Sequence, residues 1–397
     1  MNISALKFRD FRIYIIGNMF ALNGLWMQRV TVGWIAWDLT SSASYVGFVA
    51  FLNFAPTIVI GPFFGVLVDR IRVQKAALIT QASMLLLALT LYISFSLGQL
   101  GLALLPVLSG LSGIVASAHH PVRMSLAPRL VELSAVASVV AFTAINFNLA
   151  RLTGPALGGW IIATWGVGQS LFIQVLCYLP FIFAIFFLRP RQRSPRSKIA
   201  EPFFRQLSVG IRHVLHSKLI RQALIITGIF AFIIRGTLEI LPVLADGVFD
   251  NGATGLGLLT SSAGLGALVA GMTKAMMPGQ IPGRLPRPAL ISAIAGTGLV
   301  PIIGNSLSWH MSLFLIGCLG FTASMSAISM QTAIQVDLDD DLRGRVMSLW
   351  VMIGIGATAL GSIIMGLLID QIGFAAALGW VGSLGMIFLG ALVLRLW

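Results

Sequence analysis

The chain contains little charge and almost no cysteine. Only 10% of its 397 residues are Asp, Glu, Lys or Arg, whereas 57% are hydrophobic. A soluble globular chain of this length needs far more surface charge, so the composition excludes that class and indicates a membrane protein. The two cysteines, Cys177 and Cys318, lie far apart in apolar stretches. Their placement argues against a disulfide framework or a thiolate metal site.

Motifs for nucleotide and metal chemistry are also missing. The sequence has no Gly-x-x-x-x-Gly-Lys-Ser/Thr loop, no cluster of metal-ligating residues and no soluble domain to hold one. We therefore expect no cofactor, no ATP hydrolysis and no enzymatic activity. The segment Met1–Asp10 is polar and is followed by a full-length apolar stretch, so no cleavable signal is expected.

Twelve apolar stretches of about 18–27 residues run along the chain, each long enough to cross about 30 Å of hydrocarbon as a helix. The predicted fold class is therefore an all-α membrane protein with twelve transmembrane helices. The expected spans are 12–37, 44–68, 76–97, 101–119, 136–163, 168–188, 220–244, 255–277, 288–304, 309–333, 346–369 and 374–394.

The basic residues mark one side of the membrane. Of the 26 Lys and Arg residues, all but Arg29, Arg151 and Arg235 fall on the set of loops that includes the N-terminus, and the alternate loops hold none. Short basic loops stay in the cytoplasm, so both termini are expected there. The net charge of +13 follows from this pattern. We therefore expect a lipid bilayer as neighbour and no nucleic-acid partner.

The longest hydrophilic interval divides the spans into two sets of six. Its first part is rich in Arg and Pro, and its second part has apolar residues at helical spacing. The second part is predicted to be an amphipathic helix on the cytoplasmic membrane face. The expected division is an N-terminal half 1–188, a linker 189–219 and a C-terminal half 220–397.

Glycines recur at an offset of 207 residues: Gly154 with Gly361, Gly159 with Gly366, and Gly166 with Gly373. This indicates a shared helix-packing requirement and a duplicated unit. Because six spans separate equivalent positions, the halves are predicted to be parallel repeats, with a transport path between them near the membrane midplane.

Two motifs carry a family resemblance. The loop after the second span reads Gly65-Val66-Leu67-Val68-Asp69-Arg70-Ile71-Arg72-Val73-Gln74-Lys75, and the fifth span contains Gly154-Pro155-Ala156-Leu157-Gly158-Gly159. They resemble the Gly-x-x-x-Asp-Arg-x-Gly-Arg-Arg/Lys loop and the exporter motif Gly-Pro-x-x-Gly-Gly of the major facilitator superfamily. Arg72 stands where that family usually has Gly, and Lys274 replaces the acid of the second-half loop. The chain most resembles the siderophore and macrolide exporter-like branch.

This resemblance implies a monomeric secondary transporter in the bacterial cytoplasmic (inner) membrane, whose two six-helix halves rock against each other. It also implies a helix-packing role for Gly154, Pro155, Gly158 and Gly159. The same resemblance implies a conformational latch formed by Gly65, Asp69, Arg70, Arg343 and Arg345.

Few ionisable side chains lie inside the spans, where such groups normally face a cavity or a partner. Glu239 is the only acid well inside a span and is the first candidate for proton coupling; Asp38, at the outer end of the first span, is the second. Three arginines against one glutamate leave the interior with a charge of +2, which favours an anionic or zwitterionic solute. The candidates for the substrate cavity are Asn23, Trp26, Gln28, Arg29, Asn146, Arg151 and Arg235.

Each charged candidate also has a structural interpretation. Arg235 and Glu239 are four residues apart and can neutralise each other. Arg151 can bind backbone carbonyls, and Arg29 can snorkel to the outer interface.

The uncharged and histidine candidates also have more than one interpretation. Trp26 is either an interface anchor or a platform for an aromatic substrate. Asn146 and Asn148 are two apart, so at least one is expected to bond between helices. His119 and His120 either titrate near neutral pH or pack at the interface.

The sequence therefore predicts a secondary active transporter, with proton-coupled export of a small amphipathic anionic or zwitterionic compound. The alternatives are an importer of organic anions and a scaffold or biogenesis factor that has lost transport. Costly polar residues kept inside the first, fifth and seventh spans argue against the scaffold.

Overall fold

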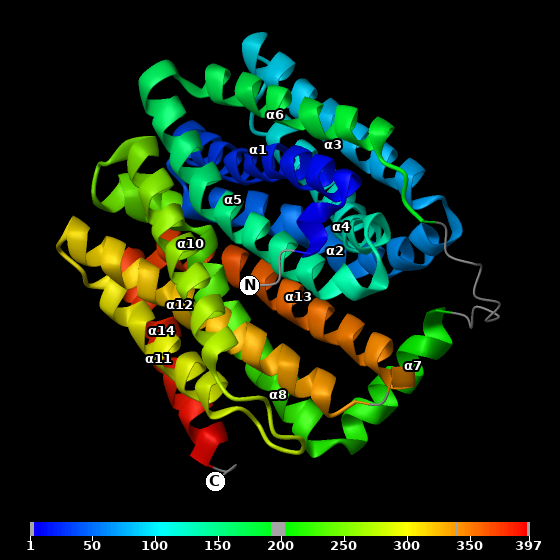
Figure 1. The fold of residues 1–397 in the computed structure, drawn as a ribbon. Coiled ribbons are helices and arrows are strands. Elements are labelled where there is room, and N and C mark those ends of the chain that lie inside the picture. The colour runs from blue at the N-terminus through cyan, green and yellow to red at the C-terminus, as the bar shows by residue number, and fades with distance from the viewer. Residues whose placement is uncertain (1–3, 192–202, 339, 395–397) are drawn as a thin grey trace.

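The computed structural model describes residues 4–191, 203–338 and 340–394, and every regular element in these ranges is helical (Figure 1). Side chains at 62–70, 203–207, 210, 340–341, 343–344 and 394 lie outside the description. The α-helices are α1 Arg9–Thr40, α2 Ala43–Arg70, α3 Val73–Ser96, α4 Leu104–Leu126, α5 Val136–Trp165, α6 Val167–Phe187, α7 Phe203–His216, α8 Lys218–Phe230, α9 Gly236–Glu239, α10 Gly252–Met276, α11 Arg287–Gly304, α12 Trp309–Val336, α13 Asp340–Ile372 and α14 Phe374–Leu394. Short 3₁₀ turns are η1 Ser4–Lys7, η2 Ala127–Leu130 and η3 Leu133–Ala135.

All twelve predicted apolar stretches are helical, and the prediction of an all-helical membrane protein is confirmed. Among the described residues, ten helices are long and apolar enough to cross a membrane. The two remaining long helices are α1, with 32 residues, and α4, with 23. Both have the length of a span but are more polar: α1 contains Arg29, and α4 contains two histidines and Arg123.

The helices before the linker, α1–α6, are here called the N-terminal bundle, and those after it, α8–α14, the C-terminal bundle (Figure 1). Within the first, α1 packs on α5 and α6, and α4 packs on α2 and α3. Within the second, α10 packs on α12, and α11 packs on α12 and α14. Two long contacts join the bundles: α2 lies along α13, and α5 lies along α10.

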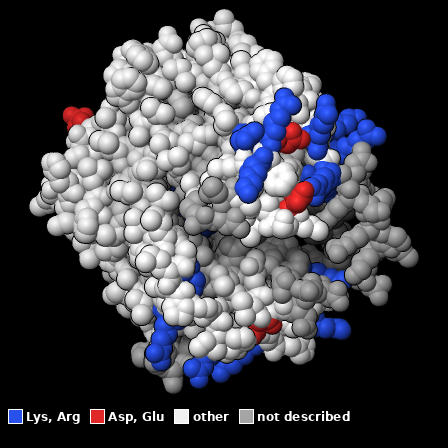
Figure 2. Space-filling view, in the orientation of Figure 1, with Lys and Arg blue, Asp and Glu red and all other residues white. Residues whose placement is uncertain are grey.

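One end of the molecule, here called the basic end, carries the helix termini that hold Lys and Arg. Several hydrogen bonds tie these termini together. The backbone N–H of Arg189 donates to Asp10, that of Arg191 donates to the carbonyl of Arg129, and the Gln74 amide donates to the carbonyl of Leu188. In Figure 2 the blue side chains gather at this end of both bundles. The predicted one-sided distribution of charge is thus present in three dimensions.

The glycines that repeat along the sequence make equivalent contacts. A methyl group at Gly154 would lie 2.7 Å from Cβ of Trp26 on α1, and one at Gly361 would lie 3.1 Å from Cα of Phe232 in the seventh span. A methyl group at Gly159 would meet Gly257 of α10.

The remaining members of the repeat behave in the same way. A methyl group at Gly366 would lie 2.9 Å from Cα of Ser44 on α2. Gly166 and Gly373 follow α5 and α13 with φ of +89° and +84°, a conformation that favours glycine. The fifth and eleventh spans therefore contact one neighbour within their own bundle and one in the other bundle through matching glycines.

The seventh span is interrupted, although the sequence predicts one continuous helix over 220–244. After α8 the chain forms a π-helical turn, η4 (Ala231–Arg235), then the short α9, and then a second π-helical stretch, η5 (Val243–Val248). Pro242 has no N–H to continue the α-helical pattern. π-Turns inside helices are rare and are frequent at functional sites, and this one ends at Arg235.

The linker contains the predicted helix, α7, which packs against α8 and α13. Its apolar side chains Ile211 and Leu215 are exposed. An exposed apolar face is what a helix lying on a membrane surface requires, and that placement stays a prediction.

The packing of α5 on α10 gives a testable expectation. Replacing Gly257 with Val would place side-chain atoms against the carbonyl of Pro155, 2.8 Å from the new Cβ, and overpacking of this kind costs about 1–3 kcal/mol. Gly271, on the same helix, has open space around it. We expect Gly257→Val to lower the unfolding temperature in detergent well below that of the matched control Gly271→Val. Equal unfolding temperatures would show that this glycine contact does not limit packing.

Candidate functional site

An ion pair joins the two bundles. Nη2 of Arg29, on α1, lies 3.0 Å from Oε1 of Glu239, at the end of α9. The side chains are 29% and 23% exposed, so they reach open space while remaining deep between the helices. The structure does not form the Arg235–Glu239 pair considered from the sequence: the last turn of α9 directs Glu239 across to the N-terminal bundle. Arg29 likewise does not snorkel outward.

Aromatic rings hold the arginines in place. The Arg29 guanidinium lies 5.1 Å from the ring centroid of Trp26 and 4.7 Å from that of Phe54 on α2. The guanidinium of Arg151, on α5, lies 5.6 Å from the same Trp26 ring. Cations over aromatic faces are attracted by the ring quadrupole. Two guanidinium groups therefore lie against the Trp26 ring. Trp26 thus belongs to the site between the bundles and is not an anchor at the membrane interface.

Arg235 completes the charge of the site. It is half-buried, and it interacts electrostatically with both Glu239 and Arg29. Arg151 interacts with Arg235, Arg29 and Glu239. Three arginines thus lie within electrostatic range of one carboxylate, and the site has the net charge of +2 expected from the sequence. Of the predicted cavity residues, Trp26, Arg29, Arg151 and Arg235 come together here with Glu239.

Three other predicted cavity residues serve the packing of the N-terminal bundle. Gln28 is buried and accepts a hydrogen bond from the Tyr178 hydroxyl at 2.9 Å. Asn146 is buried and donates to the backbone carbonyl of Ile15 at 3.0 Å. Asn23 accepts from Thr153 at 2.7 Å and so ties α1 to α5. Gln28 follows Trp26 and precedes Arg29 on the helix, and the rotation of α1 turns it away from the site.

The remaining candidates lie elsewhere. Asp38 is exposed near the end of α1, away from Glu239. Arg345 is half-buried at the basic end of α13. The side chains of Gly65, Asp69, Arg70 and Arg343 lie outside the described part of the chain, so the latch stays a prediction. In the glycine motif of α5, Gly154 and Gly158 face α1, and Gly159 faces α10.

The end opposite the basic one is closed by contacts between the bundles. The Asp370 carboxylate, at the end of α13, accepts hydrogen bonds from the Ser42 hydroxyl at 2.7 Å and from the backbone N–H groups of Ala43 and Ser44 at 2.9 Å each. A carboxylate at a helix N-terminus satisfies unpaired N–H groups and the helix dipole. The Trp37 indole donates to Asp246 at 2.8 Å nearby. The sequence placed neither contact, since each joins residues from different bundles.

The hydrogen bonds between the bundles are unevenly distributed. Those between two side chains or backbones that are both described lie in the halves of the helices nearer the closed end: besides those to Glu239, Asp246 and Asp370, Ser261 donates to Leu152 and Ser362 to Gly47. Toward the basic end Figure 2 shows the surface hollowed between the bundles, with blue side chains on both rims. The described hydrogen bonds between the bundles are therefore concentrated toward the closed end.

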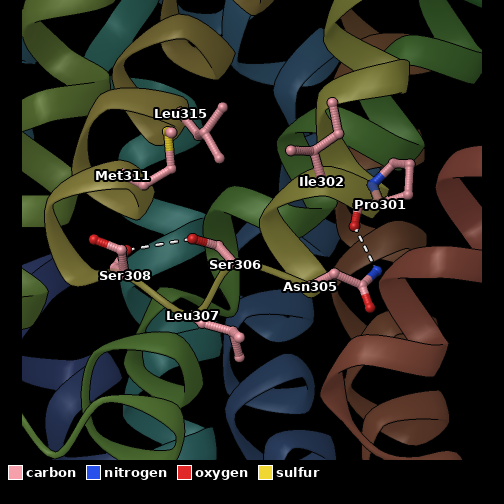
Figure 3. A pocket seen from close by; sticks show the side chains of 8 residues that line it. All are labelled: Pro301, Ile302, Asn305, Ser306, Leu307, Ser308, Met311 and Leu315. Atoms are coloured by element: carbon pink, nitrogen blue, oxygen red, sulfur yellow. Dashed lines mark hydrogen bonds between the residues drawn. The ribbon is translucent and has the colours of Figure 1, made fainter.

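A separate groove of about 640 Å³ lies on the outside of the C-terminal bundle (Figure 3). Pro301, Ile302 and Asn305 line it from the end of α11, and Met311 and Leu315 line it from α12. Leu307, on the loop between them, is 98% exposed. A shallow apolar groove on a bundle surface suits lipid chains, and it does not contain the charged residues of the site.

A membrane-embedded helical bundle with a charged site between two halves that are joined by polar contacts at one end is typical of a transporter. The sequence model of the transmembrane secretion effector family matches residues 2–397, and the chain belongs to this family of the major facilitator superfamily. It is therefore an integral membrane protein and a transporter, not an enzyme.

Relatives and solved structures agree with this assignment. The chain is 22% identical over 379 residues to the staphyloferrin A transporter of Staphylococcus aureus, covering 93% of this chain and 92% of that one. It is 23% identical over 400 residues to the enterobactin exporter EntS of Escherichia coli O1:K1, covering 99% and 93%. Its fold matches the nucleoside transporter NupG, with a TM-score of 0.71 at 11% identity, covering 97% and 98%. It also matches a bacterial homologue of the lysosomal transporter Spinster, with a TM-score of 0.67 at 13% identity, covering 96% and 94%.

The Arg29–Glu239 pair predicts unequal effects of removing either partner. Glu239→Gln leaves three arginines without a carboxylate, whereas Arg29→Gln lowers the local charge. We expect Glu239→Gln to lower the unfolding temperature more than Arg29→Gln, and the double variant to recover part of the loss. The coupling expected for such contacts is about 0.5–3 kcal/mol. Strictly additive effects in a double-mutant cycle would contradict the pairing.

The Asp370 contact predicts control of the closed end. Asp370→Ala removes three bonds to α2, and we expect the population open at this end to rise by about tenfold. Electron–electron distances between spin labels at positions 102 and 307, with Cys177 and Cys318 replaced by Ala, would report it. Asp38→Ala removes an exposed acid at the same end and is the matched control. Identical distance distributions for the two variants would contradict the role of Asp370.

Proposed function

We propose that the protein is a proton-coupled secondary transporter that exports a small amphipathic zwitterionic or anionic organic compound. The observation that carries the proposal is the convergence of Arg29, Arg151 and Arg235 on the carboxylate of Glu239, between two bundles. Charged groups at this depth are costly, and four of them in one place serve binding better than packing.

The proposed membrane arrangement has twelve spans, with α1 and α4 included, in two parallel six-helix repeats joined by the linker 189–219. The matching contacts of Gly154 with Gly361 and of Gly159 with Gly366 support the repeats. The basic end, with both termini, is proposed to face the cytoplasm, and the distribution of Lys and Arg supports this orientation. The host membrane is proposed to be a bacterial inner membrane, and the working unit a monomer.

Transport is proposed to occur by rocking of the two bundles about the central site. The solute is proposed to enter from the cytoplasm, and the hollow between the bundles at the basic end in Figure 2 supports this direction. Rotation then separates Asp370 from the N-terminus of α2 and opens the opposite end. Arg29 and Glu239 lie on different bundles, so their ion pair changes as the bundles move.

The site chemistry defines the solute. An arginine guanidinium binds a carboxylate or phenolate through two parallel hydrogen bonds, and Trp26 and Phe54 provide an aromatic surface for an apolar part. A siderophore-like or drug-like compound has these features, and the relatives that transport staphyloferrin A and export enterobactin support this class.

Electrostatics at Glu239 decide whether the solute exchanges with a proton or moves together with it. A solute that competes with a proton for the Glu239 carboxylate, as a cationic group on a zwitterionic or net anionic solute would, gives exchange and export. An anion without such a group would displace Glu239 from Arg29 and leave the carboxylate free to take a proton, so that anion and proton bind together. Cotransport of this kind describes an importer of organic anions, which is the second candidate function.

Transport by inside-out vesicles under an imposed pH gradient tests the proposal. The panel contains catecholate siderophores, macrolides and cationic dyes, with Glu239→Gln as the test variant and Asp38→Asn as the control. We expect gradient-driven accumulation of a zwitterionic or anionic member, at least tenfold lower in Glu239→Gln and near wild type in Asp38→Asn. Transport that is equal with and without the gradient would contradict proton coupling. Accumulation driven only by the reverse gradient would favour the importer, and absence of transport for every member would favour a scaffold.

A further inference from the structure

A second cationic centre lies inside the N-terminal bundle, toward the basic end, and is not part of the site described above. Arg123, on the last turns of α4, is only 9% exposed. Its guanidinium lies 5.7 Å from the ring centroid of Phe147 on α5, and it interacts electrostatically with Tyr14 on α1. The side chain thus lies where α1, α4 and α5 come together.

No carboxylate among the described residues pairs with Arg123. The two acids at this end of the N-terminal bundle that the structure describes are engaged elsewhere: Asp10 accepts from the backbone of Arg189, and Glu132 lies 3.9 Å from Arg191. A buried cation without a counter-ion costs several kcal/mol. A buried Arg123 therefore requires an anion other than the described side chains.

The groups around Arg123 include other polar atoms without partners. The Tyr14 hydroxyl and Nε2 of His119 are both buried without a hydrogen bond among the described residues. His119 lies four residues before Arg123, on the same face of α4, and both His119 and His120 interact electrostatically with it. His120 is exposed, so the cluster reaches open space through that side chain. The titratable groups facing Arg123 are thus Tyr14, His119 and His120.

Aromatic contacts connect this cluster to the central site. Phe147, which lies under Arg123, packs edge-to-face on Trp26 with ring centroids 5.8 Å apart. Trp26 in turn carries Arg29 and Arg151. The ring of Phe147 thus separates two groups of cations, one toward the basic end and one at the junction of the bundles.

We propose that Arg123, Tyr14 and His119 form an oxyanion-binding subsite, which takes the carboxylate or phenolate group of an organic solute entering from the basic end. The inference rests on the proposed function, because it assigns the entry position of the same solute. Arg123 supplies the positive charge and can donate two parallel hydrogen bonds. The Tyr14 hydroxyl and the His119 ring supply further hydrogen bonds. The solute then passes Phe147 to reach the arginines beside Trp26.

The test measures equilibrium binding of 1-naphthoate, a fluorescent aromatic carboxylate, to the full-length protein in nanodiscs without any gradient, with empty nanodiscs subtracted. We expect saturable binding by the wild type and at least tenfold weaker binding by Arg123→Gln. Arg129→Gln is the matched control, because it removes one positive charge at the same end outside the cluster. Arg123→Lys keeps the positive charge but cannot donate two parallel hydrogen bonds, so its naphthoate affinity should fall between those of the wild type and Arg123→Gln.

Tyr14→Phe separates binding from folding. The hydroxyl has no partner in this structure, so its removal should leave the unfolding temperature unchanged or raise it. The same change should weaken naphthoate binding about threefold to tenfold. A lower unfolding temperature with unchanged binding would assign Tyr14 to packing and overturn its part in the subsite.

The remaining outcomes are also decisive. If Arg123→Gln binds naphthoate like Arg129→Gln, or if the wild type shows no saturable binding, the subsite is overturned. If binding is unchanged in Arg123→Gln while the distance between labels at 102 and 307 shifts, Arg123 contacts a carboxylate of the C-terminal bundle in another state, and the proposal fails. Arg151→Gln distinguishes the two sites. If Arg151→Gln loses naphthoate binding and Arg123→Gln does not, naphthoate binds at the central site and the subsite is rejected. If Arg123→Gln loses binding and Arg151→Gln does not, naphthoate binds at the subsite and not at the central site.

Discussion

The organisation of this protein depends on how charge is held inside an apolar structure. An ionised side chain between membrane helices needs a partner, a cavity or a polarisable surface. Here Arg29 pairs with Glu239, both side chains remain partly exposed, and Arg29 and Arg151 lie over Trp26. Because the pair joins α1 to α9, the electrostatics of the site are tied to the relative position of the two bundles. A change in the charge of Glu239 is therefore also a change in the contact between the bundles.

Small residues provide the second requirement, which is close approach of the bundles without a fixed connection. Gly159 and Gly257 allow α5 and α10 to touch backbone to backbone, and Gly366 does the same for α13 and α2. Such contacts depend on van der Waals packing and few hydrogen bonds, so they can be broken at moderate cost. The polar bonds that close one end, at Asp370 and Asp246, are few and are concentrated at helix termini. The proposed rocking of the two bundles requires a combination of this kind.

The cationic cluster at Arg123 is subject to the same requirement for a partner, and it lies between the central site and the basic end. The central site has a carboxylate to neutralise part of its charge, whereas the described groups near Arg123 are Phe147, Tyr14 and the histidines. An anionic group passing from one to the other would move between two positive centres separated by an aromatic ring. Affinity at each step can then stay moderate, which a transporter needs in order to release what it binds.

Much of the fold was determined by the sequence alone. Hydrophobic length predicted every long helix, the positions of Lys and Arg predicted a basic end, and the glycine offset of 207 predicted matching contacts of the fifth and eleventh spans. These properties are local or periodic, so they can be read along one chain. The same reasoning predicted that Trp26, Arg29, Arg151 and Arg235 share a site with Glu239. It could not determine that Glu239 pairs with Arg29 rather than with Arg235, that Gln28 and Asn146 face inward, or that Asp370 caps α2. Those outcomes depend on the rotation of each helix, on the π-turn before α9 and on how the bundles meet, which only the tertiary structure decides.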